Sequence, residues 1–244
     1  MNCFSNQTIA LAKKELQSAL NSPATYGVWL FFIFFTNVSF FYLQRFFSLD
    51  SASLRPYFQI IPLVYTFLIP AITMKSWAEE RKTGTAEILL TMPFSEWDLV
   101  LGKFISACVI LIIALLLTLS VPLSLFPLGD FDKGVLISEY VGTLLLGMAA
   151  ISVGLLFSSL AKNQISAFLG GVVVLLAIML INQLTSFIDL PKLLADFLNY
   201  FSLAFHFESF AKGILDSRDV LFFLLVTVLL LFVNTRILQF RKWS

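Results

Sequence analysis

Long stretches without Asp, Glu, Lys or Arg alternate with short charged segments along this chain. About 20 apolar helical residues cross the roughly 30 Å hydrocarbon core of a bilayer. Five stretches reach that length, and the sixth reaches it if Arg236 extends its guanidinium towards the lipid head groups. We therefore predict an all-α integral membrane protein, a single transmembrane domain over residues 1–244, with spans near 24–44, 56–76, 104–127, 140–161, 164–188 and 219–239.

The composition supports the membrane prediction and excludes other classes. Apolar residues make up 59% of the 244 residues and charged residues 13%, about half the charge of a soluble domain. A net charge of +1 provides no basic field for phosphates, so nucleic acid is not an expected partner. Cys3 and Cys108 suggest neither a disulfide nor a metal site. The first dozen residues lack the apolar core of an export signal, so we expect the N-terminus to be retained.

Lys and Arg are more numerous on the side of the six spans that carries both termini than on the other side. Cytoplasmic loops of membrane proteins carry such an excess. We therefore expect both termini to be cytoplasmic.

Residues 9–20 have the pattern of an amphipathic helix lying in the cytoplasmic interface. The apolar positions are Ile9, Ala12, Leu16 and Ala19, and Lys13, Lys14 and Gln17 occupy another face. The alternative is a simple helical extension of the first span.

The cytoplasmic connection 75–103 predicts two short helices. Gly84 suits a left-handed stop for the first helix, Thr85 can cap the second, and Pro93 ends it. Ser95 and Asp98 then resemble a capping box that opens the third span. A stiff, charged element just below the bilayer is one that a partner could push.

The connection 189–219, on the opposite side, is too apolar for free solution and too often interrupted by charges for a span. Short helices that dip back into the outer leaflet against the protein would satisfy both features. A lid lying on the surface is the alternative.

No catalytic or metal-binding constellation is visible in the sequence. His206 has no second His and no Cys nearby, so we expect no metal site. Glu79 and Glu80 do not fit the Glu-Glu-x-x-x-Arg pattern of intramembrane proteases, and Ser158 has no His that would take its proton. We therefore do not expect an enzyme.

A row of small residues lies along one face of the fourth span and predicts close helix packing. The row is Gly147, Ala150, Gly154 and Ser158. The predicted spans hold no ion-coupling carboxylate, and the chain has no Gly-Lys-Ser or Gly-Lys-Thr phosphate loop. Energy for any uphill transport would have to come from another chain.

The stretch 79–93, EERKTGTAEILLTMP, followed by Leu101-Gly102-Lys103, resembles a signature of the membrane permease subunits of type 2 ABC exporters. The branch with gliding-motility and copper-enzyme-maturation permeases is the most similar. Weaker similarities are Lys14-Glu15-Leu16 with Ser22-Pro23, Ser158-Ser159-Leu160, and His206-Phe207 with Lys212-Gly213 and Asp216.

The resemblance implies an elbow helix with Lys13, Lys14 and Glu15, and re-entrant outer helices with Phe197, Phe201, His206 and Gly213. It implies a coupling helix between spans two and three with Glu79, Glu80, Arg81, Lys82, Gly84, Thr85 and Glu87. It also implies a multi-pass protein of the prokaryotic plasma (inner) membrane.

The implied partners are two ATP-binding-cassette ATPase subunits, which would bind ATP and Mg, and a second copy of this permease or a related one. Membrane lipids are expected contacts, an extracytoplasmic accessory protein is left open, and no cofactor is expected on this chain. The expected function is export of a lipid-like, glycan or other amphipathic substrate. The alternative is a membrane scaffold whose ATPase drives a mechanical or maturation step without translocation.

Overall fold

The computed structural model describes residues 6–46, 53–85, 94–129, 131–187 and 191–242. These residues form helices and contain no strand. Six of the described helical segments are long and apolar enough to cross a membrane: Pro23–Leu43, Ile61–Lys82, Glu96–Leu125, Lys133–Leu160, Gln164–Thr185 and Ser217–Phe240. The predicted all-α architecture with six spans is therefore confirmed.

The first half of the chain contains α1 (Asn6–Leu20), α2 (Pro23–Val38), the π-helical turn η1 (Ser39–Leu43), α3 (Arg55–Gln59), α4 (Ile61–Lys82) and α6 (Glu96–Thr118). The second half contains α7 (Ser120–Leu125), the 3-10 turn η3 (Phe126–Leu128), α8 (Lys133–Leu160), α9 (Gln164–Phe187), α10 (Lys192–Tyr200), α11 (Leu203–Ala211) and α12 (Ser217–Lys242).

Charged residues do not end these helices, which run further than the charge-free stretches. Helix α6 begins at Glu96 and α8 at Lys133, each several residues before its predicted span. Helix α4 continues without a break through Lys75 to Lys82, so the first of the two short helices expected in the connection 75–103 is instead the end of α4. The reason is that a helix needs only its backbone hydrogen bonds, which charged side chains at its ends do not interrupt; Lys82 and Lys133 are exposed.

Helices α8 and α4 form the centre of the bundle. The apolar window of α8 is 67% buried and that of α4 56%, against 22% for α9 and 28% for both α2 and α12. Two glycines bring α8 close to its neighbours. A Cβ at Gly154 would lie 2.3 Å from Oγ1 of Thr73 in α4, and one at Gly147 would lie 2.3 Å from Cδ2 of Leu111 in α6.

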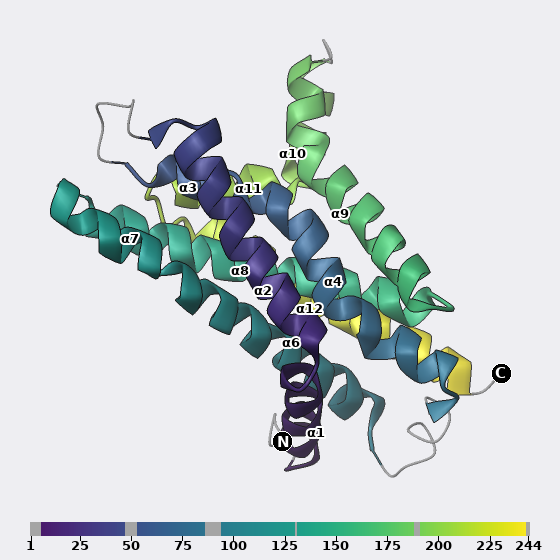
Figure 1. The fold of residues 1–244 in the computed structure, drawn as a ribbon. Coiled ribbons are helices and arrows are strands. Elements are labelled where there is room, and N and C mark those ends of the chain that lie inside the picture. Colours follow the sequence, from purple (N-terminus) through teal and green to yellow (C-terminus); the bar gives the residue numbers. More distant parts are fainter. Residues whose placement is uncertain (1–5, 47–52, 86–93, 130, 188–190, 243–244) are drawn as a thin grey trace.

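Figure 1 shows how the two ends of the bundle differ. Helix α1, the start of α6, the end of α4 and the last turns of α12 gather in the lower part of the view. Helices α3, α10 and α11 lie at the upper end, and α11 packs against α8 and α9. Both ends use short helices that do not span the bundle.

Candidate functional site: a charged junction at the end of α4

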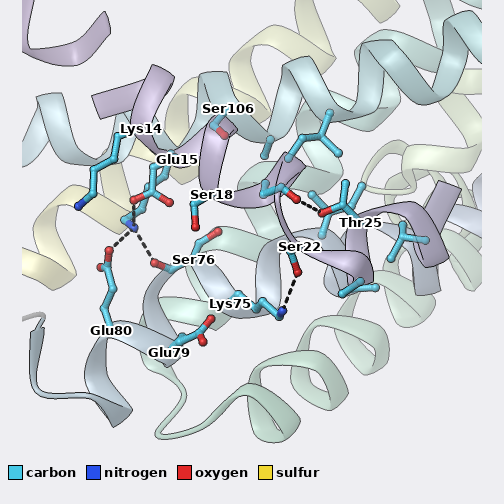
Figure 2. Close-up of a pocket in the computed structure, with 18 of the residues that line it drawn as sticks. Lys14, Glu15, Ser18, Ser22, Thr25, Lys75, Ser76, Glu79, Glu80 and Ser106 are labelled. Atoms are coloured by element: carbon cyan, nitrogen blue, oxygen red, sulfur yellow. Dashed lines mark hydrogen bonds and ion pairs between the residues drawn. The ribbon is translucent and has the colours of Figure 1, made fainter. Parts of the chain in front are cut away.

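A buried ammonium joins three helices at the lower end of the bundle. Lys103 of α6 has a side chain only 1% exposed, and its Nζ lies 3.0 Å from Oε1 of Glu15 in α1. The same Nζ lies 2.7 Å from Oε1 of Glu80 in α4 and donates to the carbonyl oxygen of Ser76 at 2.7 Å. Figure 2 shows Glu15, Ser76 and Glu80 converging on this point. We call Glu15, Ser76, Glu80 and Lys103 the α4 junction.

The neighbouring glycine explains how α1 reaches Lys103. A Cβ at Gly102 would lie 2.8 Å from Cδ2 of Leu11, so the missing side chain lets α1 lie directly against α6. Thr8, one turn before Leu11, donates its hydroxyl hydrogen to Oδ1 of Asp98 at 2.5 Å. The structure thus explains the Leu101-Gly102-Lys103 sequence. Gly102 leaves room for α1 to pack against α6, and Lys103 forms an ion pair with Glu15 of α1.

This contact also changes the predicted apolar face of α1. The buried residues are Thr8, Leu11 and Ala12, whereas Ile9, expected on the apolar face, is 56% exposed. Packing against α6 determines which side of α1 is buried. The spacing of apolar residues in α1 alone does not predict that side. Lys13 and Lys14 are exposed and Glu15 is half-buried in the junction.

The end of α4 is tied to α8 as well. Oγ of Ser158 accepts from the backbone N–H groups of Trp77 at 3.1 Å and Ala78 at 3.4 Å. Arg81 donates from Nη1 to the carbonyl oxygens of Ala161 at 2.6 Å and Leu160 at 3.3 Å. A cation at the last carbonyls of a helix is favoured by the helix dipole and satisfies acceptors that lack an intrahelical partner.

The chain turns away from the bundle directly after α4. Gly84 has φ of +72°, the left-handed conformation expected for the stop at that position. Thr83 bonds from its hydroxyl to the carbonyl of Glu79 at 3.0 Å, and Thr85 bonds to that of Glu80 at 3.3 Å. The second predicted short helix, with Glu87, lies outside the described residues.

The chain re-enters the bundle at Ser95. Ser95 caps α6 by accepting from the backbone N–H of Asp98 at 3.1 Å, as the capping-box prediction required. The connection between α4 and α6 thus has a defined turn at each of its described ends.

The predicted coupling residues divide into two groups. Glu80 and Arg81 turn inwards, where they hold α1, α6 and α8. Glu79, Lys82, Gly84 and Thr85 are exposed. The second group alone is exposed among the described coupling residues.

The junction holds one buried ammonium between two partly buried carboxylates. Lys103 opposes two carboxylates in a largely dry environment, where removing one partner of an ion pair costs much more than at a surface. Oε2 of Glu80 is buried and has no hydrogen-bond partner within the described part of the chain. Such a group is sensitive to any shift of α4 relative to α1 and α6.

A cavity of about 460 Å³ opens beside the junction. It lies between α1, α2, α4 and α6, and Figure 2 shows its polar lining. Lys75 extends into it and donates from Nζ to Oγ of Ser22 at 3.3 Å. We call this space the junction cavity.

The predicted re-entrant segment forms two short helices at the opposite end, of unequal burial. No residue of α10 is buried, and Phe197 and Phe201 are 61% and 54% exposed. Helix α11 buries most of its apolar residues, and Gly213 follows it with φ of +79°.

His206 ties α11 to α12. Its Nδ1 lies 2.6 Å from Oδ1 of Asp219 and its Nε2 lies 3.0 Å from the carbonyl oxygen of Tyr200. The ring stacks on Phe222 at 3.7 Å between centroids. The ring thus contacts the Asp219 carboxylate with one nitrogen and a backbone carbonyl with the other. We call these four residues the α11 cap. The described residues contain no group of three or more His, Cys, Asp or Glu side chains suited to a metal ion.

Sequence reasoning missed two buried charges. Lys103 was noticed only as part of a motif, although the adjacent Gly102 signals a close helix approach. Glu139 of α8 is 1% exposed, and its Oε1 has no partner among the described residues. Glu139 directly precedes the predicted span 140–161, so the prediction left it outside the membrane-spanning helix. No feature of the sequence indicates that it is buried.

Comparisons with known proteins agree with the architecture. The family model of the ABC-2 family transporter proteins matches residues 9–242. A protein named "Probable multidrug ABC transporter permease YbhR", from Escherichia coli K12, is 25% identical over 155 residues, which are 64% of this chain and 42% of that protein. Its counterpart from Escherichia coli O157:H7 matches to the same extent. The chain therefore matches less than half the length of these relatives.

Proposed function

This chain belongs to the ABC-2 family of transporter proteins, and from that premise we propose that it is a permease subunit driven by separate ATP-binding-cassette ATPase subunits. In this proposal the protein lies in a prokaryotic plasma membrane with both termini in the cytoplasm, and pairs with a second permease. ATP and Mg are bound by the ATPase. The permease itself supplies the path and the mechanical link.

The observation that carries this proposal is the position of the α4 junction. The exposed residues Glu79, Lys82 and Thr85 directly adjoin a point where α1, α4, α6 and α8 are joined by ion pairs and hydrogen bonds. A force applied to the exposed residues therefore reaches four helices together. Packed interfaces move as units between discrete arrangements, which makes such a junction suited to tilting spans.

The cargo in this proposal is an amphipathic molecule. The spans carry apolar and small hydroxyl side chains along most of their length, and the related permeases are named for multidrug transport. Lipid-like compounds fit such a path better than hydrated ions, which require rings of charge or carbonyl groups. Glycans remain within the proposed class.

Site-specific photocrosslinking in native membranes tests the proposal. A crosslinker at Thr85 is expected to capture an ATP-binding-cassette ATPase, and one at Asp196 on exposed α10 is the matched control, expected to capture none. The reversal Lys82→Glu should reduce recovery of the ATPase with the tagged permease, because an exposed docking charge is reversed while the buried junction and the cavity lining are kept. The reversal Lys192→Glu should leave recovery unchanged.

Capture of the ATPase at Asp196 but not at Thr85 would contradict the proposal. Transport or hydrolysis by the isolated chain would also contradict it. If the ATPase is captured at Thr85 and no amphipathic compound stimulates its ATP hydrolysis, the scaffold alternative replaces export.

A further inference from the structure

An apolar groove adjoins the junction cavity. The groove has a volume of about 370 Å³ and runs between α2, α4 and α9, with Phe31, Phe67 and Phe168 among its lining residues. Ala24, Val28 and Ala71 line both spaces, so the two spaces are neighbours. A polar compartment thus lies beside an apolar one along α2 and α4.

Residues of α4 at intervals of four line both the junction cavity and the groove. Phe67, Ala71, Lys75 and Glu79 are each four residues apart, so each lies next to the following one in a row that winds slowly round the helix. Phe67 lines the groove, Ala71 lines both spaces, and Lys75 and Glu79 line the cavity. The order along the helix is apolar, small, cationic and anionic over about 18 Å.

The two charges in this row are not consumed by the α4 junction. Nζ of Lys75 has one hydrogen bond, to Ser22, and forms no ion pair within the described part of the chain. Glu79 forms none there either. Deeper in the same cavity, the buried Oε2 of Glu80 also lacks a partner among the described residues. The cavity therefore offers one ammonium with nearby hydroxyls for an anion, and carboxylate oxygens one turn further for a cation.

We propose that the junction cavity and the groove bind one phospholipid whose head group carries both a phosphate and a primary amine, of the phosphatidylethanolamine class. The phosphate lies at Lys75 and Ser22, because an ammonium with an adjacent hydroxyl suits a phosphate oxygen. The amine lies at Glu79, and an acyl chain follows Ala71 towards Phe67 and Phe31. Small side chains at Ala24 and Ala71 leave room for the chain where the two spaces meet.

This inference concerns binding by the chain itself and does not depend on an ATPase. The lipid would hold α2 beside α4 at the end where the exposed coupling residues begin. Its binding is measured without ATP or a partner, so a failed ATPase interaction and a failed lipid interaction are separate results.

Native mass spectrometry of the full purified chain tests the inference. The probes are phosphatidylethanolamine and phosphatidylglycerol with identical acyl chains, which share the phosphate and differ in the amine. We expect one tightly held phosphatidylethanolamine, with a dissociation constant at least about tenfold below that of phosphatidylglycerol, the range for one charge-assisted hydrogen bond. Equal affinity for the two lipids would overturn the assignment of the amine site.

Three variants separate the parts of the site. Lys75→Gln should weaken both lipids about tenfold, because it removes the phosphate partner. Glu79→Gln should lower the affinity for phosphatidylethanolamine to that for phosphatidylglycerol. Ala71→Trp should weaken both lipids by filling space where the cavity and the groove adjoin. Lys162→Gln, exposed just beyond α8, and Leu225→Trp, exposed on α12, are the matched controls and should bind as the unmodified chain does.

Photolabelling of the unmodified chain tests the site without any variant, so a folding defect cannot affect its result. A phosphatidylethanolamine with a photoreactive acyl chain should label peptides that contain Phe31, Phe67 or Phe168. Labelling confined to α12, or variants at Lys75 and Ala71 that bind as their controls do, would overturn the proposal.

Discussion

The α4 junction and the α11 cap hold opposite ends of the same bundle by different means. The junction relies on a buried ammonium between two carboxylates, with α1, α4 and α6 each supplying a group. The cap relies on aromatic packing with one His–Asp contact, between α11 and α12. Attraction between charges reaches further in a dry environment than dispersion, which acts only at contact. The comparison shows that the junction joins three helices through charged groups, while the cap joins α11 to α12.

The largest loss of stability is expected when the cation of the α4 junction is removed. Lys103→Met leaves Glu15 and Glu80 without their shared cation and should lower the free energy of unfolding by about 3–5 kcal/mol. Unfolding in mixed detergent micelles measures the change. Adding Glu15→Gln and Glu80→Gln should recover much of the loss, because the stranded charges are then gone. Lys82→Met, exposed on the same end, is the control; equal stability of the Lys103 and Lys82 variants would contradict the junction's role.

The second-largest expected effect on stability concerns the close packing of α4 against α8 at Gly154. Gly154→Ala places a Cβ 2.3 Å from Oγ1 of Thr73 and should destabilise by about 1–3 kcal/mol through overpacking. Gly27→Ala in α2 meets no atom within 4 Å and should stabilise by up to about 1 kcal/mol, since alanine favours helix. The same unfolding assay compares both. A stable Gly154 variant would show that α4 and α8 can separate without cost.

A smaller effect is expected at the cap. His206→Phe keeps an aromatic ring beside Phe222 but leaves Asp219 without its partner, which should cost about 1–2 kcal/mol. Hydrogen exchange should rise in α11 and remain unchanged in α1. Combining it with Asp219→Leu should restore protection of α11. Increased exchange at α1 would contradict the separation of the two ends.

The smallest effect is expected at the edge of the junction. Arg81→Gln removes the cation from the last carbonyls of α8 and should lower stability by about 0.5–1 kcal/mol, because the site is partly solvated. Lys162→Gln, exposed just beyond α8, is the control for loss of charge near the same terminus. High salt should reduce the difference between the Arg81 variant and the unmodified chain; a difference independent of salt would contradict the electrostatic cause.

The sequence predicted those features that depend on neighbours along the chain. Hydropathy located the six spans, the left-handed turn was expected at Gly84, and Ser95 was expected to cap α6. It did not predict the partners of Lys103, because Glu15 lies 88 residues away in the chain. It also misplaced Ile9, since the buried face of α1 is chosen by α6, and it left Glu139 outside the membrane-spanning helix. The partners of Lys103, the buried side of α1 and the burial of Glu139 all depend on contacts between helices that are distant in the sequence.

Distance measurement between two spin labels tests the central claim, that the α4 junction moves as one unit under the ATPase. Labels at Ile9 in α1 and Thr85 after α4, in a Cys3→Ser and Cys108→Ser background, report the junction, and labels at Thr85 and Asp196 report the whole bundle. In the complex with the ATPase, a nonhydrolysable ATP analogue should shift the second distance and leave the first unchanged, while Lys103→Met should make the first distance change as well. A shift between Ile9 and Thr85 in the unmodified junction would contradict the account.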